Sequence, residues 1–248
     1  MAILTVVQNL FVPNDEMLEK TINSLNSLKQ LVENDNTIFK FSGWCIKEEY
    51  WDIIEPIINS LNPYTFIKKD KNFGKATNIN ELLIDIKTPF IFTLDSDIVL
   101  KSEIDYYSKF KELFDIENIG IIALDLEVNN CHLYDHQNLK RIHNGHDIFW
   151  NFMGNGIAGG CLLISKKAWD EVGGYKVMGV YTGEDGEFFL DVKRKNYFVG
   201  LDRSLAVIHP HDNNREYQLW KLHVCNRDSN KVKTDISDIV DEATNRWL

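Results

Sequence analysis

Apolar residues in the first hundred positions follow two patterns: short continuous runs, and longer stretches with an apolar residue every three or four positions. The continuous runs predict β-strands at residues 3–7, 37–42, 64–68 and 91–94. The periodic stretches predict one helix from the N-cap Asn14 to about residue 31, and others at 48–61 and 78–86. Because strands and helices alternate in this way, we expect an α/β fold with a mostly parallel central sheet flanked by helices.

The pattern changes after residue 100. Helices are predicted at 103–114, 167–172 and 185–195, and strands at 119–128, 161–165 and 204–208. The segment 129–157 is long, polar and rich in histidine, asparagine and glycine, so we interpret it as a functional loop. Two more helices are predicted at 217–226 and 236–247. The chain has no repeat or obvious linker, and we expect one domain over residues 1–215 with a helical C-terminal tail, 216–248, packed on it.

The composition is that of a globular protein and argues against several classes. Of the 248 residues, 44% are hydrophobic, and no run approaches the ~20 apolar residues of a membrane span. The formal net charge of −10 disfavours binding driven by nucleic-acid phosphates. Four widely spaced cysteines indicate neither a disulfide framework nor a zinc ribbon. The N-terminus lacks the basic region of a signal peptide, so we expect a cytoplasmic protein.

Two carboxylates stand at the end of the fourth predicted strand. Side chains alternate along a strand, so Asp95 and Asp97 are expected on one face with Cα atoms roughly 6.6 Å apart. The carboxyl end of a buried strand is where open α/β sheets bind their ligands. Two charges buried there need compensation, which a divalent metal carrying a diphosphate would supply. The simpler alternative is an acidic turn that leaves the strand.

Four motifs in one order give the chain a family resemblance. They are KNFGKATNIN at 71–80, LDSD at 94–97, GGCLLISKKAWDEVGGYKVMGVYTGEDGEF at 159–188 and AVIHPHD at 206–212. In this order and spacing they resemble the GT-A glycosyltransferases, both the family-2 enzymes and the β-1,4-galactosyltransferases. The resemblance implies a Rossmann-like GT-A fold over about residues 3–212. It also implies transfer of a sugar from a nucleotide diphosphate sugar to an acceptor hydroxyl, with a divalent cation that is usually manganese.

The resemblance also implies which residues bind the donor nucleotide and the metal. Asp95 would contact the ribose or nucleotide, and Asp97 would bind the metal. His209 matches the metal-binding histidine of the family by position, and His211 is its competitor one residue further from the strand. Carboxylate oxygens suit Mn²⁺ or Mg²⁺, and an added imidazole shifts the choice towards Mn²⁺.

Further donor contacts are expected from a lysine and from glycine-containing turns. Lys75 would add positive charge near the diphosphate or nucleotide. Asn72 and Gly74 would form a turn that brings backbone close to the ligand. Gly159 and Gly160 would let the donor sugar lie against the backbone, which a side chain would prevent.

The GED motif at 183–185 begins a predicted helix and carries the expected chemistry. In the matched family its aspartate is the general base, which assigns that role to Asp185 and leaves Glu184 as a contact to the acceptor or donor sugar. A base near a helix N-terminus is expected to have a low pKa. Attack opposite the leaving diphosphate would invert the anomeric centre, although retaining GT-A families share similar acidic motifs.

One departure from the family affects the choice of donor. Many family-2 enzymes carry a base-contacting aspartate after the second strand, where this chain has Ser42 and Gly43. Uracil and guanine therefore both stay open, with uridine diphosphate the commoner choice in such families. The acceptor also stays open among a glycan, a lipid-linked sugar and a protein, and a nucleic acid is less favoured.

Two other functions are alternatives to a glycosyltransferase. A nucleotidyltransferase also pairs carboxylates with a metal, but it would be expected to carry a glycine-rich basic loop after its first strand. Residues 7–14 contain neither glycine nor lysine. The second alternative is a catalytically silent protein that still binds a sugar nucleotide.

Overall fold

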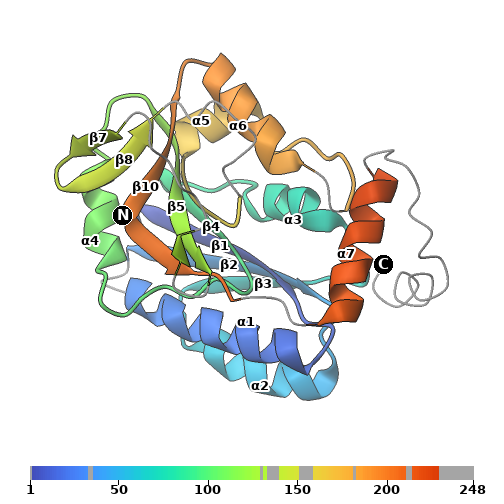
Figure 1. The fold of residues 1–248 in the computed structure, drawn as a ribbon. Helices are drawn as coiled ribbons and strands as arrows, with labels where there is room; N and C mark the ends of the chain where they lie inside the picture. Colours follow the sequence, from blue (N-terminus) through green and yellow to red (C-terminus); the bar gives the residue numbers. More distant parts are fainter. Residues whose placement is uncertain are drawn as a thin grey trace.

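The computed structural model describes residues 2–32, 36–128, 131–132, 140–150, 159–180, 183–210 and 214–228. Within these residues, ten strands form one sheet in the order β3-β2-β1-β4-β9-β5-β10-β8-β7, and β6 pairs with β5 beside that path. Helices cover both faces of the sheet (Figure 1). None of the described helices combines the length and the apolar character needed to cross a lipid bilayer.

The first half of the chain forms the parallel part of the sheet. Its strands are β1 (Leu4–Phe11), β2 (Thr37–Trp44), β3 (Tyr64–Lys68) and β4 (Phe90–Asp95). Every neighbouring pair among these strands runs parallel, with β1 between β2 and β4. The helices between them are α1 (Asp15–Ser27), continued by a 3-10 turn (Leu28–Leu31), α2 (Glu48–Asn59) and α3 (Gly74–Leu82). The alternation predicted from the sequence is confirmed.

The second half adds an antiparallel strand and returns to parallel pairing. Its long strands are β5 (Ile119–Val128), β9 (Cys161–Ser165) and β10 (Phe198–Ile208). Strand β9 runs antiparallel between β4 and β5, while β10 runs parallel to β5. The helices are α4 (Tyr106–Leu113), α5 (Lys166–Val172), α6 (Glu184–Arg194) and α7 (Arg215–Asp228).

The interpretation of residues 129–157 as a loop is wrong for the part that the structure describes. Strands β6 (Cys131–His132), β7 (Lys140–His143) and β8 (His146–Trp150) occur there. The β7–β8 hairpin extends the sheet, because β8 pairs antiparallel with β10. Polar composition hid these strands, since a hairpin at the margin of a sheet need not alternate strongly between apolar and polar positions.

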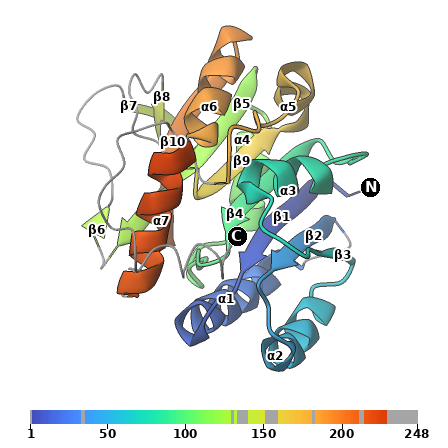
Figure 2. The ribbon, with the colours of Figure 1, turned by 90° about the vertical axis from the view of Figure 1, so that its right-hand side faces the viewer.

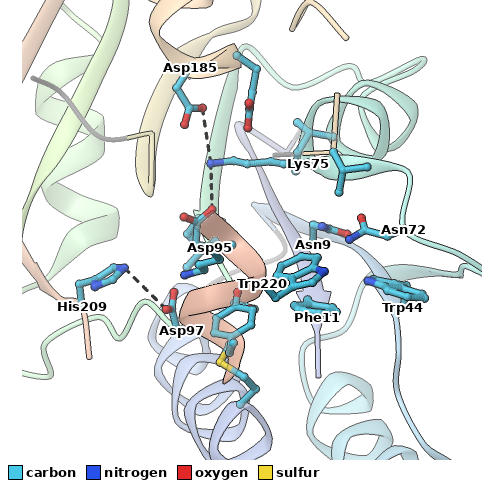
Figure 3. Close-up of a pocket in the computed structure, with 18 of the residues that line it drawn as sticks. Asn9, Phe11, Trp44, Asn72, Lys75, Asp95, Asp97, Asp185, His209 and Trp220 are labelled. Atoms are coloured by element: carbon cyan, nitrogen blue, oxygen red, sulfur yellow. Dashed lines mark ion pairs between the residues drawn. The ribbon is translucent and has the colours of Figure 1, made fainter. Parts of the chain in front are cut away.

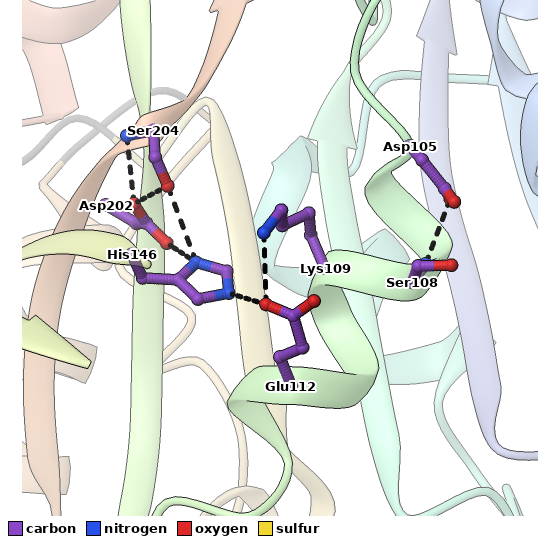
Figure 4. A network of polar contacts seen from close by, with 7 residues as sticks. All are labelled: Asp105, Ser108, Lys109, Glu112, His146, Asp202 and Ser204. Atoms are coloured by element: carbon purple, nitrogen blue, oxygen red, sulfur yellow. Dashed lines mark hydrogen bonds and ion pairs between the residues drawn. The ribbon is translucent and has the colours of Figure 1, made fainter. Parts of the chain in front are cut away.

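Strand β10 begins six residues before its predicted start and includes a buried polar residue, Asp202, that is paired with a neighbouring strand. Asp202 is fully buried, and its Oδ2 lies 2.5 Å from His146 Nδ1 on the neighbouring strand β8. The other imidazole nitrogen of His146 lies 3.1 Å from Glu112 Oε2 on α4 (Figure 4). Asp202 therefore occupies a strand position, although its residue type is typical of turns. The predicted helix at 236–247 lies outside the described residues.

Two hydrophobic cores hold helices to opposite faces of the sheet. On one face, residues of α1, α2 and α4 such as Leu25, Ile54 and Phe110 pack against Phe39 and Phe92. On the other face, α3, α5 and α6 pack against the remaining face of the same strands, with Ile79, Trp169 and Phe188 against Val7 and Ile91 among others. Neighbouring positions such as 91 and 92 of β4 thus serve different cores, as strand alternation requires.

The carboxyl ends of β1, β2 and β4 lie at one edge of the sheet, next to the beginning of α3 and α6. Figure 2 shows α7 beside this edge, where Tyr217 and Trp220 of α7 pack against Trp44 and the neighbouring Phe11. The fold therefore brings segments from four distant parts of the chain to a single edge, where ligands of open α/β sheets bind.

Candidate active site

A cavity of about 460 Å³ opens at this edge of the sheet. Seven residues predicted from the sequence line it, namely Asn72, Lys75, Asp95, Asp97, Glu184, Asp185 and His209 (Figure 3). They come from the start of α3, the end of β4, the start of α6 and the end of β10. His211, the predicted competitor of His209, lies outside the described residues.

The two aspartates of the LDSD motif differ in their surroundings. Asp95 is the last residue of β4, and its backbone N–H donates to the carbonyl of Gly160 at 2.8 Å. Asp97 lies in the turn after the strand, so strand alternation does not explain its direction. Both side chains nevertheless line the cavity, with Asp95 40% exposed and Asp97 nearly buried.

Lys75 joins two of the acidic residues. Its Nζ lies 2.9 Å from Asp95 Oδ1 and 3.6 Å from Asp185 Oδ1, and it donates to the carbonyl of Gly159 at 2.8 Å. Burial alone would lower the pKa of Lys75, but the carboxylates of Asp185 and Asp95 raise it well above its usual value. In this arrangement the lysine charge is engaged by carboxylates and fixes their positions relative to each other.

The start of α3 places Lys75 at the cavity. Asn72 Oδ1 accepts from the backbone N–H of Gly74 at 2.9 Å, and α3 begins there, four residues before its predicted start. Gly74 has φ +82°, and a Cβ at this position would lie 2.8 Å from the carbonyl oxygen of Gly179. Any other residue would therefore disturb the turn that positions the neighbouring lysine.

Position 159 has to be glycine because the side chain of Asp185 lies directly beside it. A Cβ at Gly159 would lie 1.9 Å from Cγ of Asp185, whereas one at Gly160 would meet nothing nearer than Asp95 Oδ2 at 3.4 Å. The resemblance predicts a donor sugar in the space beside both glycines. In the structure the space beside Gly159 holds the Asp185 carboxylate.

The acidic pair of the GED motif lies in the first turn of α6. Burial raises the pKa of Asp185, although Lys75 opposes the shift. Burial, followed by the neighbouring charge of Asp185, raises the pKa of Glu184 to about 7. The expected low pKa of a base at a helix N-terminus is therefore wrong here, because the loss of hydration outweighs the helix dipole.

Asp97 and His209 form a pair on the opposite side of Asp95 from the lysine. His209 follows β10, and its backbone N–H donates to the carbonyl of Glu127 at 2.9 Å. His209 Nε2 lies 3.7 Å from Asp97 Oδ2. Two bonds of about 2.1 Å each, typical of small divalent ions, span this separation, so the pair fits one metal ion. The described residues contain no cluster of three or more histidine, cysteine or acidic side chains suited to a metal.

Aromatic residues that the sequence analysis did not select form one wall of the cavity. Phe11 stacks on Trp44 with ring centroids 5.7 Å apart and on Trp220 at 5.4 Å, and Tyr217 stacks on Trp220 at 5.7 Å. Phe11 and Trp44 end β1 and β2, so their positions at the sheet edge could have identified them. The position of α7 beside them had no signal in the sequence.

Comparisons with known proteins give solved structures alone, because no family model and no curated protein match the chain. Staphylococcus aureus TarS superposes on 98% of this chain and 43% of its own, with 14% identity and a TM-score of 0.63. TarS 1–349 in complex with UDP has 14% sequence identity and a TM-score of 0.64, and the match covers 98% of this chain and 71% of the TarS chain. Mannosyltransferase PcManGT from Pyrobaculum calidifontis, in complex with GDP-Man and Mn²⁺, has 10% sequence identity and a TM-score of 0.61. The match covers 98% of this chain and 69% of the PcManGT chain.

These likenesses confirm the expected fold class, an α/β GT-A fold with a central sheet flanked by helices. The chain spans less than half of the longer TarS chain and about 70% of the two shorter chains. The resemblance to the β-1,4-galactosyltransferases stays a prediction.

Proposed function

We propose that this protein is a metal-dependent glycosyltransferase that moves a sugar from a nucleotide diphosphate sugar to an acceptor hydroxyl. The observation that carries the proposal is the convergence of the Asp97–His209 pair and the Asp95–Lys75–Asp185 cluster in one cavity at the ligand-binding edge of a GT-A sheet. Solved structures of the same fold, bound to UDP or to GDP-Man with Mn²⁺, support a nucleotide donor, and we propose a UDP-sugar.

Asp97 and His209 would hold the metal in this proposal, with His211 as the alternative imidazole. An oxygen and an imidazole ligand favour Mn²⁺, with Mg²⁺ as the alternative. When bound, the ion would stabilise the negative charge that appears on the diphosphate as the donor bond breaks. Asp95, at the end of β4, would contact the ribose, with Asn72 and Gly74 forming the turn beside the nucleotide.

Asp185 would act as the general base. Its carboxylate takes the proton of the acceptor hydroxyl, the hydroxyl oxygen bonds to the anomeric carbon, and the bond to the diphosphate oxygen breaks with its electrons leaving on the phosphate. The raised pKa of Asp185 makes it a better proton acceptor at neutral pH than an exposed aspartate. Attack from the side opposite the diphosphate gives inversion. Glu184, in the same turn, would contact the sugar.

Lys75 would position the reacting groups rather than bind phosphate from the outset. Its three contacts hold Asp95, Asp185 and the carbonyl of Gly159 around one nitrogen. Contact with the diphosphate requires one of these carboxylates to be released. Gly160, next to Asp95, leaves the sugar room against the backbone. The helical tail, residues 216–248 in this proposal, contributes Tyr217 and Trp220 of α7 to the site.

Two substitutions separate metal-dependent binding from the chemical step. We expect Asp97→Ala to abolish Mn²⁺-dependent binding of the donor nucleotide, measured by calorimetry. Asp185→Asn should bind the donor as the wild type does and lose transfer or hydrolysis of the nucleotide sugar. The matched control is Asp170→Asn, because Asp170 lies on α5 outside the cavity in an exposed ion pair with Lys166.

Equal loss of donor affinity in the folded Asp97→Ala and Asp185→Asn proteins would contradict the separate roles. Donor binding without any turnover in the wild type would favour the catalytically silent alternative.

A further inference from the structure

Asn9 has a side chain whose orientation is fixed by two neighbours. It lies on β1 between Ser42 of β2 and Asp95 of β4 in the strand register. Its Oδ1 accepts from Ser42 Oγ at 2.8 Å and from Asn78 Nδ2 at 3.0 Å. Asn9 is half-buried and lines the cavity, and its Nδ2 makes no hydrogen bond to another described residue. The amide donor is therefore the part of this side chain that is left to face the cavity.

The surroundings of Asn9 suit a flat ring. Phe11, Trp44 and Trp220 form the aromatic wall at this end of the cavity, and Figure 3 shows Asn9 between Asp95 and Trp44. Aromatic side chains favour stacking on the π-face of a base without selecting which base it is. Selection therefore has to come from a polar group at the ring edge.

Ser42 stands where the resemblance predicts a base-contacting aspartate that this chain lacks. Its hydroxyl donates to Asn9, so it supports the amide instead of presenting a carboxylate to the ligand. This end of the cavity thus offers an oriented N–H donor. A donor recognises a ring carbonyl and disfavours an exocyclic amino group at the same position, because two donors that face each other leave both unpaired.

We propose that Asn9 determines base specificity, its amide donating to the ring carbonyl of a keto nucleobase, uracil or guanine, and rejecting cytosine and adenine. This inference rests on the proposed binding of a nucleotide donor. Uracil O4 and guanine O6 are carbonyl oxygens, whereas cytosine and adenine carry an amino group at the corresponding position. A site whose polar groups match one partner discriminates strongly against an analogue that leaves them unpaired.

The substitution Asn9→Asp changes the group that faces the cavity and little else. Aspartate keeps an Oδ1 that can accept from Ser42 and Asn78, while an acceptor oxygen replaces the amide donor. The added charge weakens the binding of every nucleoside diphosphate, so the informative quantity is the ratio of affinities between paired nucleotides. Lys221→Gln is the matched control, since Lys221 of α7 lines the same cavity and the substitution changes the charge there by the same amount.

The test is calorimetric titration of UDP, CDP, GDP and ADP into the full chain with Mn²⁺. If the base is uracil, we expect the wild type to bind UDP at least about tenfold more tightly than CDP. If the base is guanine, we expect it to bind GDP at least about tenfold more tightly than ADP. In Asn9→Asp the ratio should fall to about one or reverse, and in Lys221→Gln it should stay at the wild-type value. Should Asn9→Asp not fold, Asn9→Ser also removes the amide and should abolish the preference.

Two outcomes would overturn the inference, and they are distinguishable. If the wild type binds nucleotides and Asn9→Asp leaves the affinity ratio of the paired nucleotides unchanged, or Lys221→Gln changes that ratio as much, Asn9 is excluded as the specificity residue and the proposed function still stands. A wild type that binds none of the four nucleotides with Mn²⁺ would remove the proposed function together with the inference.

Discussion

The buried carboxyl group of Glu184 predicts how the free energy of unfolding changes with pH. Its side chain is 7% exposed in the first turn of α6, and burial together with Asp185 raises its pKa from 4.5 to about 7. One pKa unit corresponds to about 1.4 kcal/mol between the two protonation states. The ionised carboxylate in the folded protein is therefore about 3 kcal/mol less stable than in the unfolded chain.

This cost depends on pH in a defined direction. Well below pH 4.5, Glu184 is protonated in both states and its ionisation costs nothing, and at pH 4.5 the cost is still only about 0.4 kcal/mol. Between pH 4.5 and pH 7 the unfolded chain gives up the proton more readily, so stability falls as pH rises. We expect Glu184→Gln, which cannot ionise, to be more stable than the wild type by about 3 kcal/mol at pH 8 and nearly equal to it at pH 4.5.

The assay is urea denaturation of both proteins at several pH values, without metal or nucleotide. Glu187→Gln is the matched control, because Glu187 lies in the same turn with an exposed side chain near Lys176. It should change the free energy of unfolding by less than about 0.5 kcal/mol across the range. A stability gain in Glu184→Gln that is the same at pH 4.5 and pH 8 would refute the reasoning.

Three further substitutions test the geometry of the cavity. Lys75→Met removes the cation between two carboxylates and should cost about 2 kcal/mol of unfolding free energy at pH 8 and less in acid, because burial raises the pKa of Asp185 and its charge is lost as pH falls; a cost that does not change with pH would contradict this. Gly159→Ala should lower sugar transfer by about tenfold or more because its Cβ would overlap the neighbouring carboxylate, while Gly186→Ala, whose Cβ would meet nothing within 4 Å, should be tolerated; the comparison needs initial rates at saturating donor, and similar losses would argue against it. Trp220→Leu should weaken UDP binding by about tenfold in calorimetry, whereas Leu222→Ala, on an exposed part of the same helix, should not.

The parallel half of the fold was predicted well from the sequence because its strands are continuous apolar runs that are buried in the core. Residues such as Phe92 and Ile91 serve opposite cores, and that burial leaves a clear pattern. Only residues 204–208 of β10 were predicted as a strand, and the β7–β8 hairpin was not predicted. Strands β8 and β10 pair beside a contact between His146 and Asp202, two polar residues 56 positions apart, and this contact cannot be predicted from either segment alone.

The sequence predicted which residues line the candidate site better than it predicted how those residues are arranged. Motif order selected Asp95, Lys75 and Asp185, and the structure places all three within one cluster. The ion pairs of Lys75 with Asp95 and Asp185 were not predicted, because an ion pair depends on distance in the folded protein and not on spacing along the chain. Burial at the start of α6 likewise reversed the expected pKa of Asp185, since a helix dipole is visible in a sequence and desolvation is not.

The central claim is that the acidic edge of the sheet binds a nucleoside diphosphate through a divalent ion. Calorimetric titration of UDP and of GDP into the protein, with Mn²⁺ and with EDTA, tests it most directly. The account predicts binding of at least one nucleotide with Mn²⁺, loss of that binding in EDTA and in His209→Ala, and hydrolysis of the matching nucleotide sugar. Absence of binding by both nucleotides in the presence of Mn²⁺, in a protein shown to be folded, would contradict it.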